Sequence, residues 1–465
     1  MIREFFSRRP QAGANRRRAV AGRAPVRAAT CSVVVALLLL GGAAGARAEA
    51  PALGFAASLA RLWQEHPEVQ QAEAALRAAG YDKSAAWAGF LPYAQLDMAR
   101  SEDGDEQFAR VVLPLWRGGL NFASLDVAEA GRLAAAADLQ RTRLRLGLRL
   151  ADAYFNELAA REQALEWGRY LAVLAELQGL IERRAAGGVS PEADVQTVLT
   201  RLRQADAEAA LNESLRAAAA AQYVALVGSL AEPAGWPPAS VQLAAPEIAA
   251  ALQRDLGQHP EPAYAQAVAA REAASARRSR AQLSPEVSLR HTEPFGDEAD
   301  ISEPVTQIVL QYQTDNGLRA YQGYRAGQQR QAAAEAAIAA ARRDVTAALL
   351  AARADYEAAR AQLAYQGAAV SASDAVVASA LRQFEAGRKT WIEVLNAQRE
   401  AHENRLQQVR QRQRLWQANA RLALQGLFWE RLLREDTTAA AADTATSTTD
   451  TAPTTPPAAT GETTP

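Results

Sequence analysis

The sequence predicts a mainly α-helical protein that crosses a membrane with β-strands and consists of two similar halves. Three observations lead to this fold class. Long stretches rich in Ala, Leu, Arg, Glu and Gln contain no proline, several motifs recur roughly 200 residues later, and each half holds one short segment of alternating polar and apolar residues.

Residues 1–48 have the composition of a secretory signal peptide. Eight arginines precede an apolar run over residues 32–40, which is too short to anchor a protein in a bilayer, and Ala46 and Ala48 form a cleavage site before Glu49. Cleavage removes nine arginines and one glutamate, so the formal net charge changes from −1 to −9. An acidic mature chain argues against a nucleic-acid partner, and no later segment is apolar enough to predict a membrane-spanning helix.

One very long helix is predicted from Leu120 to Ala186. This stretch contains no proline and would extend roughly 100 Å, which is longer than an ordinary globular core. Its many alanines allow neighbouring helices to approach closely and favour coiled-coil packing. A spectrin-like or filamentous coiled coil is therefore an alternative at this point.

An internal repeat divides the chain. His66-Pro67-Glu68 recurs as His259-Pro260-Glu261 (259 minus 66 is 193), and Asp194-Val195 matches Glu393-Val394 (393 minus 194 is 199). Beyond Thr437 the chain has almost no large apolar side chain and cannot bury a core. The expected domains are a signal peptide (1–48), a first repeat (49–230), a Pro-rich linker (231–246), a second repeat (247–434) and a disordered tail (435–465).

Each copy contains one segment with the pattern of a β-hairpin. In the first copy, Pro92 to Ser101 and Phe108 to Trp116 flank the polar turn Glu102 to Glu106. In the second copy, Pro285 to Thr292 and Val305 to Gln313 flank an acidic loop. We therefore expect four strands per chain.

The last of these strands shows the alternation clearly. Ile308 and Leu310 fall on one face and Gln307 and Gln311 on the other, as in a wall with lipid outside and water inside. Four strands cannot close a barrel, and an open edge has no partner in lipid, so several chains would have to share one barrel. Two soluble hairpins packed on helices are the alternative, which the export signal and the very long helices disfavour.

A helix reversal with strong capping signals lies in the second copy. Gly387 ends one helix, Thr390 is positioned to cap the next, and Glu393 three residues later completes a capping box. These residues are thus explained by capping alone.

The first copy contains a matching reversal. Gly187 and Gly188 end the helix, Ser190 is the expected cap, and Pro191 fits the first helical position. Asp194 falls in the first turn, where an anion interacts favourably with the helix dipole. Capping alone is again a sufficient explanation.

Three motifs are more specific than these patterns. Leu91-Pro92 enters the first strand, Pro114 to Gly119 leaves the second, and Phe384 to Gln398 reads FEAGRKTWIEVLNAQ. With them the chain, from His66 to about Leu433, resembles the TolC family of outer-membrane efflux and type I secretion proteins, the outer membrane factors. The strand exit of the second copy departs from the family pattern because it lacks the proline.

The resemblance implies a homotrimer in the bacterial outer membrane. Three times four strands would form a 12-stranded β-barrel in outer-membrane lipid, continued by a long α-helical barrel, a coiled-coil tunnel in the periplasm. The implied partners are a periplasmic adaptor (membrane fusion) protein and an inner-membrane transporter of RND or ABC type. The implied function is an exit duct for small molecules or secreted proteins.

The family also places its constricted periplasmic entrance at the helix reversals. Asp194 and Glu393 match acidic positions there, and Asn396 stands where a second acid occurs. Lys389 and Phe384 match positions that hold the entrance shut. Threefold symmetry would turn each carboxylate into a ring of three, which favours cations and raises the carboxyl pKa by repulsion.

No enzymatic constellation is recognisable in the sequence. His66 and His259 belong to the repeated motif at helix starts, and His291 and His402 lack the paired spacing of a zinc site. We therefore expect no enzyme, no cofactor and no resident metal. A periplasmic coiled-coil scaffold without a pore is the main alternative function, and an exported hydrolase is a weaker one.

Overall fold

The computed structural model describes residues 52–101, 104–228, 232–253, 256–295, 303–312 and 319–428, which belong to one compact unit. The expected signal peptide over 1–48, the expected tail over 435–465 and residues 313–317 of the strand exit in the second copy lie outside these residues.

Long helices dominate the described chain. α3 covers Leu120–Ala186, the limits expected from its lack of proline, and α7 at Arg319–Glu385 has the same length of 67 residues. Both consist largely of residues with high helix propensity. The other helices are α1 (Phe55–Glu65), α2 (Pro67–Ala88), α4 (Glu192–Val227), α5 (Ala245–Gln253), α6 (Pro260–Ala281) and α8 (Trp391–Gln425), with short 3₁₀ helices at Ala239–Val241 and Leu256–Gln258.

α2 and α6 begin in the same way. His66 caps α2, and its Nδ1 accepts the backbone N–H of Glu68 at 3.2 Å. His259 caps α6, and its Nδ1 accepts the N–H of Glu261, also at 3.2 Å. Each histidine satisfies an N–H that has no partner within its helix, and the position expected for both at helix starts is confirmed.

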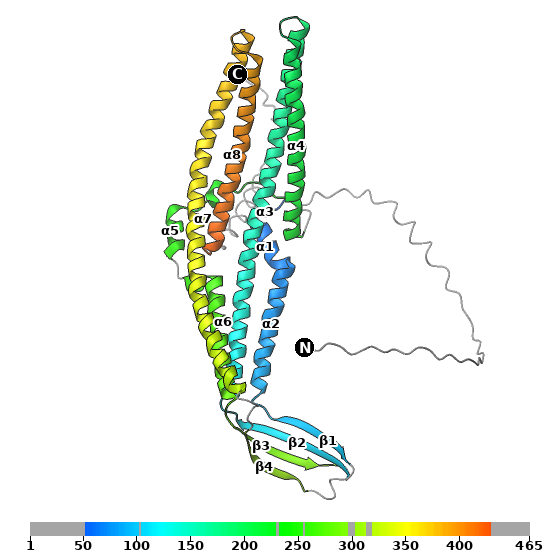
Figure 1. Ribbon diagram of the computed structural model, residues 1–465, viewed down its shortest axis with the longest axis vertical. Coiled ribbons are helices and arrows are strands. Elements are labelled where there is room, and N and C mark those ends of the chain that lie inside the picture. Colours follow the sequence, from blue (N-terminus) through cyan, green and yellow to red (C-terminus); the bar gives the residue numbers. More distant parts are fainter. Residues whose placement is uncertain are drawn as a thin grey trace, which may run out of the picture. The chain divides into compact units, whose positions relative to one another are not determined.

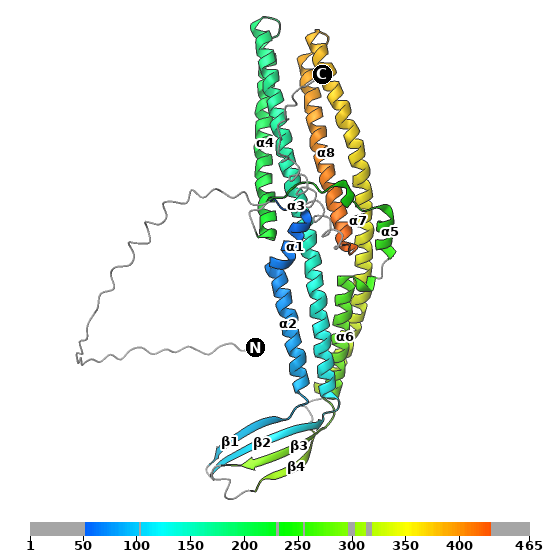
Figure 2. The same cartoon turned by 180° about the vertical axis from the view of Figure 1, so that it is seen from behind.

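α3 is the helix around which the others pack. It contacts α2, α4, α6 and α8, while α7 packs against α6 and α8. The α3–α4 and α7–α8 hairpins extend to the end of the helical bundle that lies away from the sheet, and α2 and α6 lie on the sheet side (Figures 1 and 2). Among the helices of the described part, none combines the length and the apolar character that a bilayer crossing requires.

An aromatic core joins α1, α3 and α4 in the middle of the bundle. Tyr154 packs edge-on against Phe55 and Tyr223, with ring centroids 5.4 and 5.8 Å away. The Tyr223 hydroxyl lies 2.7 Å from the Ser58 Oγ, and the Tyr154 hydroxyl donates to the carbonyl of Gly235 at 3.0 Å. The buried hydroxyls are thus satisfied, and one of them fixes the linker to the bundle.

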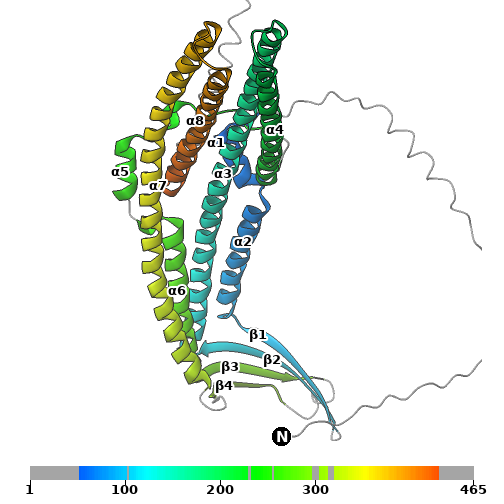
Figure 3. The same cartoon turned by 45° about the horizontal axis from the view of Figure 1, so that its top comes forward.

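Four strands form one antiparallel sheet in the order β1-β2-β3-β4, at the end of the helices (Figure 3). The central pair joins the two halves of the chain, with Val111 opposite His291. The register shifts between Pro114 and Trp116, where proline's missing N–H would interrupt a regular ladder. The strands are β1 (Tyr93–Ser101), β2 (Gly104–Trp116), β3 (Glu286–Pro294) and β4 (Val305–Gln311).

Five strand limits differ from the sequence-based expectation. β1 begins one residue late at Tyr93, β3 begins one residue late at Glu286, and β4 ends two residues early at Gln311. β2 begins at Gly104, so the expected turn over 102–106 was too long. Asp105 and Glu106 instead pair with Arg100 and Ala99, because ladder hydrogen bonds come from the backbone and tolerate polar side chains. β3 likewise continues past Thr292 to Pro294.

Candidate functional site

The candidate site comprises the two helix reversals, at the end of the bundle that lies away from the sheet (Figure 1). The first reversal connects α3 to α4 over residues 187–191, and the second connects α7 to α8 over residues 386–390. Nine of the ten residues selected from the sequence lie in these connections or within one turn of them. The tenth, Asn396, follows in the second turn of α8.

The second reversal is closed by glycine and by a carboxylate. Gly387 has φ +71°, and its N–H donates to the Phe384 carbonyl at 2.9 Å. The Glu393 carboxylate accepts the backbone N–H of Thr390 at 2.8 Å and the Thr390 hydroxyl at 2.7 Å. These two hydrogen bonds, followed by the positive charge of Lys389, lower the pKa of the exposed Glu393 carboxyl.

The first reversal repeats this backbone geometry. Gly188 has φ +69° and its N–H donates to the Ala185 carbonyl at 2.9 Å, while Gly187 has an ordinary φ of −80°. The N–H of Val189 donates to the Arg184 carbonyl at 2.8 Å. Each of these hydrogen bonds has a counterpart 199 positions later (387 minus 188).

The expectation that Ser190 caps α4 was wrong. Pro191 is the N-cap, in an extended conformation with φ −72° and ψ 150°, and no side chain forms a cap hydrogen bond. The repeat contained the signal for this, because the 199-residue offset aligns Pro191 with the cap Thr390. The Ser190 hydroxyl instead accepts a long hydrogen bond of 3.5 Å from Arg184 Nε.

The polar site residues differ in exposure. Glu393 and Asn396 are both exposed and lie three positions apart, hence on one face of α8. Asp194 and Lys389 are half-buried. The structure thus places Glu393 and Asn396 side by side, with Asp194 on the other reversal.

Phe384 links the two helical hairpins. Its ring is 6% exposed and lies 5.1 Å from the ring of Trp391 at the start of α8. The Arg184 guanidinium of α3 lies over the Phe384 ring, with Cζ 4.8 Å from the centroid, a cation–π contact. Arg184 was not selected from the sequence, because nothing local connects residues that are 200 positions apart.

An apolar cluster lies behind both reversals. Leu174 and Ile181 of α3, Val198 of α4 and Val394 of α8 are almost completely buried in it. Further along, His402 stacks on Tyr170 at a centroid distance of 4.2 Å, and burial, followed by the charge of Arg405, lowers the pKa of His402 to about 4. Apolar packing therefore holds the two hairpins together on this side of the molecule.

The helix reversals offer a set of positioned charges. Across the described residues there is no group of three or more His, Cys, Asp or Glu side chains that could hold a metal ion. The carboxylates lie near an end of the helices, with a cation and an aromatic link beside them. Such a set can select ions or hold helices together.

Comparison with known proteins defines the class of fold. No family model and no curated protein matches the chain. Solved structures do match, and the fold that the chain shares with them is that of outer-membrane channels.

Three of these structures show the extent of the likeness. The outer membrane protein VceC from Vibrio cholerae is 18% identical with a TM-score of 0.69, over 82% of this chain and 96% of VceC. CusC is 15% identical with a TM-score of 0.71, over 83% and 95% of the two chains. The open state of the MtrE outer membrane channel from Neisseria gonorrhoeae is 16% identical with a TM-score of 0.63, over 80% and 88%.

Proposed function

We propose that the protein is an outer-membrane channel, the exit duct of a tripartite export system. The observation that carries the proposal is the four-stranded sheet, whose edge strands β1 and β4 each have a neighbouring strand on one side only within the described chain. Leu96 and Met98 of β1 and Ile308 and Leu310 of β4 are each 68–70% exposed. Open edges are satisfied by pairing with further strands, and exposed apolar side chains on a sheet are covered by lipid.

The assembly that satisfies this need is a homotrimer. Three copies of four strands would close a 12-stranded β-barrel, and the long helices would continue it as a helical tunnel in the periplasm. The strand lengths of 7 to 13 residues are compatible with tilted membrane-spanning strands. The channel fold of the similar structures supports this assembly.

Two similar units within the chain are part of the proposal. The order helix, hairpin, long helix, reversal, helix occurs twice, and α2 and α6 share a length of 22 residues as α3 and α7 share 67. We therefore retain the two repeats over 49–230 and 247–434, with the linker over 231–246, as an internal duplication. The signal peptide over 1–48 would direct export, and the tail over 435–465 would follow the second repeat.

The helix reversals would form the periplasmic entrance. In a trimer, Glu393 and Asp194 would each supply a ring of three carboxylates, with Asn396 beside the Glu393 ring. Repulsion within such a ring would oppose the hydrogen bonds that lower the pKa of Glu393 in the single chain. Phe384 and Lys389 would hold the closed state. The partners would be a periplasmic adaptor protein and an inner-membrane transporter of RND or ABC type.

The first test is assembly and conductance. Outer-membrane extracts are expected to contain a heat-modifiable trimer of the processed chain, and the purified trimer is expected to conduct in planar bilayers. A processed chain that is freely soluble without detergent and forms no pores would instead indicate a periplasmic scaffold.

The second test addresses the entrance. The double variant D194A/E393A is expected to weaken block by divalent cations and to raise the fraction of open time, because both carboxylate rings are lost. A matched control is E192A, which removes an exposed carboxylate next to the same reversal. If D194A/E393A shows the same conductance and the same cation block as wild type, both residues act only at the helix ends and not in the entrance.

A further inference from the structure

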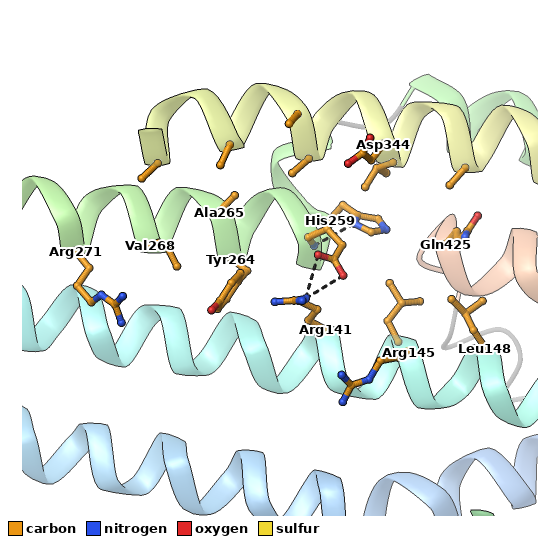
Figure 4. Close-up of a pocket in the computed structure, with 18 residues that line it drawn as sticks. Arg141, Arg145, Leu148, His259, Tyr264, Ala265, Val268, Arg271, Asp344 and Gln425 are labelled. Atoms are coloured by element: carbon orange, nitrogen blue, oxygen red, sulfur yellow. Dashed lines mark hydrogen bonds and ion pairs between the residues drawn. The ribbon is translucent and has the colours of Figure 1, made fainter. Parts of the chain in front are cut away.

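A cavity of about 660 Å³ lies between α3, α6 and α7, where the end of α8 approaches them (Figure 4). This volume is within the usual range for small-molecule sites. One wall is a row of alanines on α7, including Ala337 and Ala341, and the opposite wall includes Leu144 and Leu148 of α3. The body of the cavity is therefore apolar.

His259 presents an unused hydrogen-bond donor in this cavity. The side chain is 4% exposed, and its Nδ1 accepts the N–H of Glu261, so the proton of the neutral ring is on Nε2. Burial lowers the pKa of His259 to about 4, which keeps the ring neutral at pH 7. The buried Nε2 has no hydrogen-bond partner in the described chain.

Gln425 presents an unused acceptor in the same cavity. Its Oε1 is also buried and without a hydrogen-bond partner among the described residues. The His259 ring points toward the end of the cavity where Gln425 lies, and Arg271 marks the opposite end (Figure 4). A buried donor and a buried acceptor at one end of an apolar cavity fit a group that can both accept and donate, such as a hydroxyl.

Each arginine that lines the cavity has a carboxylate partner, and the exposed Asp344 adds a negative charge to the lining. Arg141 pairs with Glu261 at 3.0 Å and lies over the Tyr264 ring at 4.7 Å. Arg145 pairs with Glu68 at 2.7 Å. Because these cations have carboxylate partners, the cavity favours an uncharged ligand over an anion.

We propose that this cavity binds an uncharged amphipathic molecule through one hydroxyl group. The hydroxyl would bond to His259 Nε2 and Gln425 Oε1, and the apolar body would lie along the alanine face of α7. This site goes beyond the proposed channel function and lies away from the helix reversals. Among the two capping histidines only His259 has this setting, since His66 is half-exposed.

The test compares two probes that differ by one hydroxyl, 1-naphthol and naphthalene. The processed full chain in lipid nanodiscs is titrated with each probe by fluorescence, with empty nanodiscs as the measure of partition into lipid. We expect saturable binding of one 1-naphthol per chain. The variant A341F, which fills the cavity from half-buried Ala341, is expected to abolish it.

H259N separates the hydrogen bond from helix capping, because asparagine is an excellent N-cap but lacks the Nε2 donor. H259N is expected to weaken 1-naphthol binding about fivefold, the effect of one lost hydrogen bond, and to leave naphthalene binding unchanged. H66N, the same substitution at the matching cap of α2, is expected to change neither.

Absence of saturable binding above lipid partition would overturn the proposal, as would 1-naphthol binding that A341F leaves intact. If H259N lowers the affinity for 1-naphthol and for naphthalene equally, the hydroxyl group has no role in binding. The measurement needs no pore activity and can be repeated in buffer with a water-soluble chain, so its failure is distinct from a failure of the channel function.

Discussion

The two helix reversals have the same backbone conformation but different side chains. Gly188 and Gly387 have φ values of +69° and +71°, and the hydrogen bonds around them match. At the start of the next helix, however, Pro191 has no side-chain cap, whereas Thr390 is bonded to Glu393. The difference shows that glycine and backbone carbonyls suffice to reverse the chain, so the acidic side chains can vary without loss of the turn.

The largest expected effect concerns the residue that precedes each glycine by three positions, Phe384 in one reversal and Ala185 in the other. F384A removes a buried ring that packs on Trp391 and is expected to lower the free energy of unfolding by about 3 kcal/mol. Urea titration of the purified protein measures this loss. F384L, the matched control, keeps most of the apolar volume and is expected to cost about half as much.

A double-mutant cycle isolates the contact of Phe384 with the first hairpin. R184A, F384L and the double variant are expected to show a coupling energy of about 0.5–1 kcal/mol. If the changes in unfolding free energy of R184A and F384L simply add in the double variant, Arg184 does not link the hairpins in solution.

The next effect tests whether the glycines are equivalent. G188A and G387A are each expected to lower the free energy of unfolding by about 1–2 kcal/mol, because alanine is strained at a positive φ. A Cβ at either position meets no atom within 4 Å, so the cost comes from the backbone conformation alone. G187A is the control, since Gly187 has φ −80°, and a clear loss there would contradict the shared geometry.

The smallest effect concerns the charge of Glu393. Because its pKa is lowered in the folded chain, ionised Glu393 adds stability above the unfolded carboxyl pKa of about 4.3, and this stability is lost as the pH falls below it. E393Q keeps the capping geometry but not the charge. Wild type is therefore expected to exceed E393Q in urea midpoint at pH 7, and the difference is expected to shrink as the pH falls through the lowered pKa of Glu393. A difference in urea midpoint that does not change with pH would assign the effect to geometry instead.

Local signals account for the part of the fold that was predictable. Leu120–Ala186 is helical because nothing in it interrupts a run of helix formers, and Gly387 marks a reversal because few other residues adopt a positive φ. The cap of α4 was misplaced because Pro191 suits both the cap and the first helical position. The 199-residue offset between the repeats, which aligns Pro191 with Thr390, is a stronger signal for the position of the cap than the residue type alone.

Contacts between distant segments could not be predicted. Arg184 meets Phe384, and His259 and Gln425 line one cavity, only because several long helices pack at particular rotations. A single sequence specifies which face of a helix is apolar, but not which partner covers it. The proposed ligand site therefore had no counterpart among the sequence-based predictions.

The pairing of β2 with β3 has a consequence for how the molecule is made. These central strands are separated in the chain by the whole of α3, α4, α5 and α6. A two-stranded ribbon is at best marginally stable by itself, so β1 and β2 stay without their third strand until the residues from 286 onwards are available. Chains truncated before that point would expose an unpaired strand edge, which is the feature that a chaperone or protease can recognise.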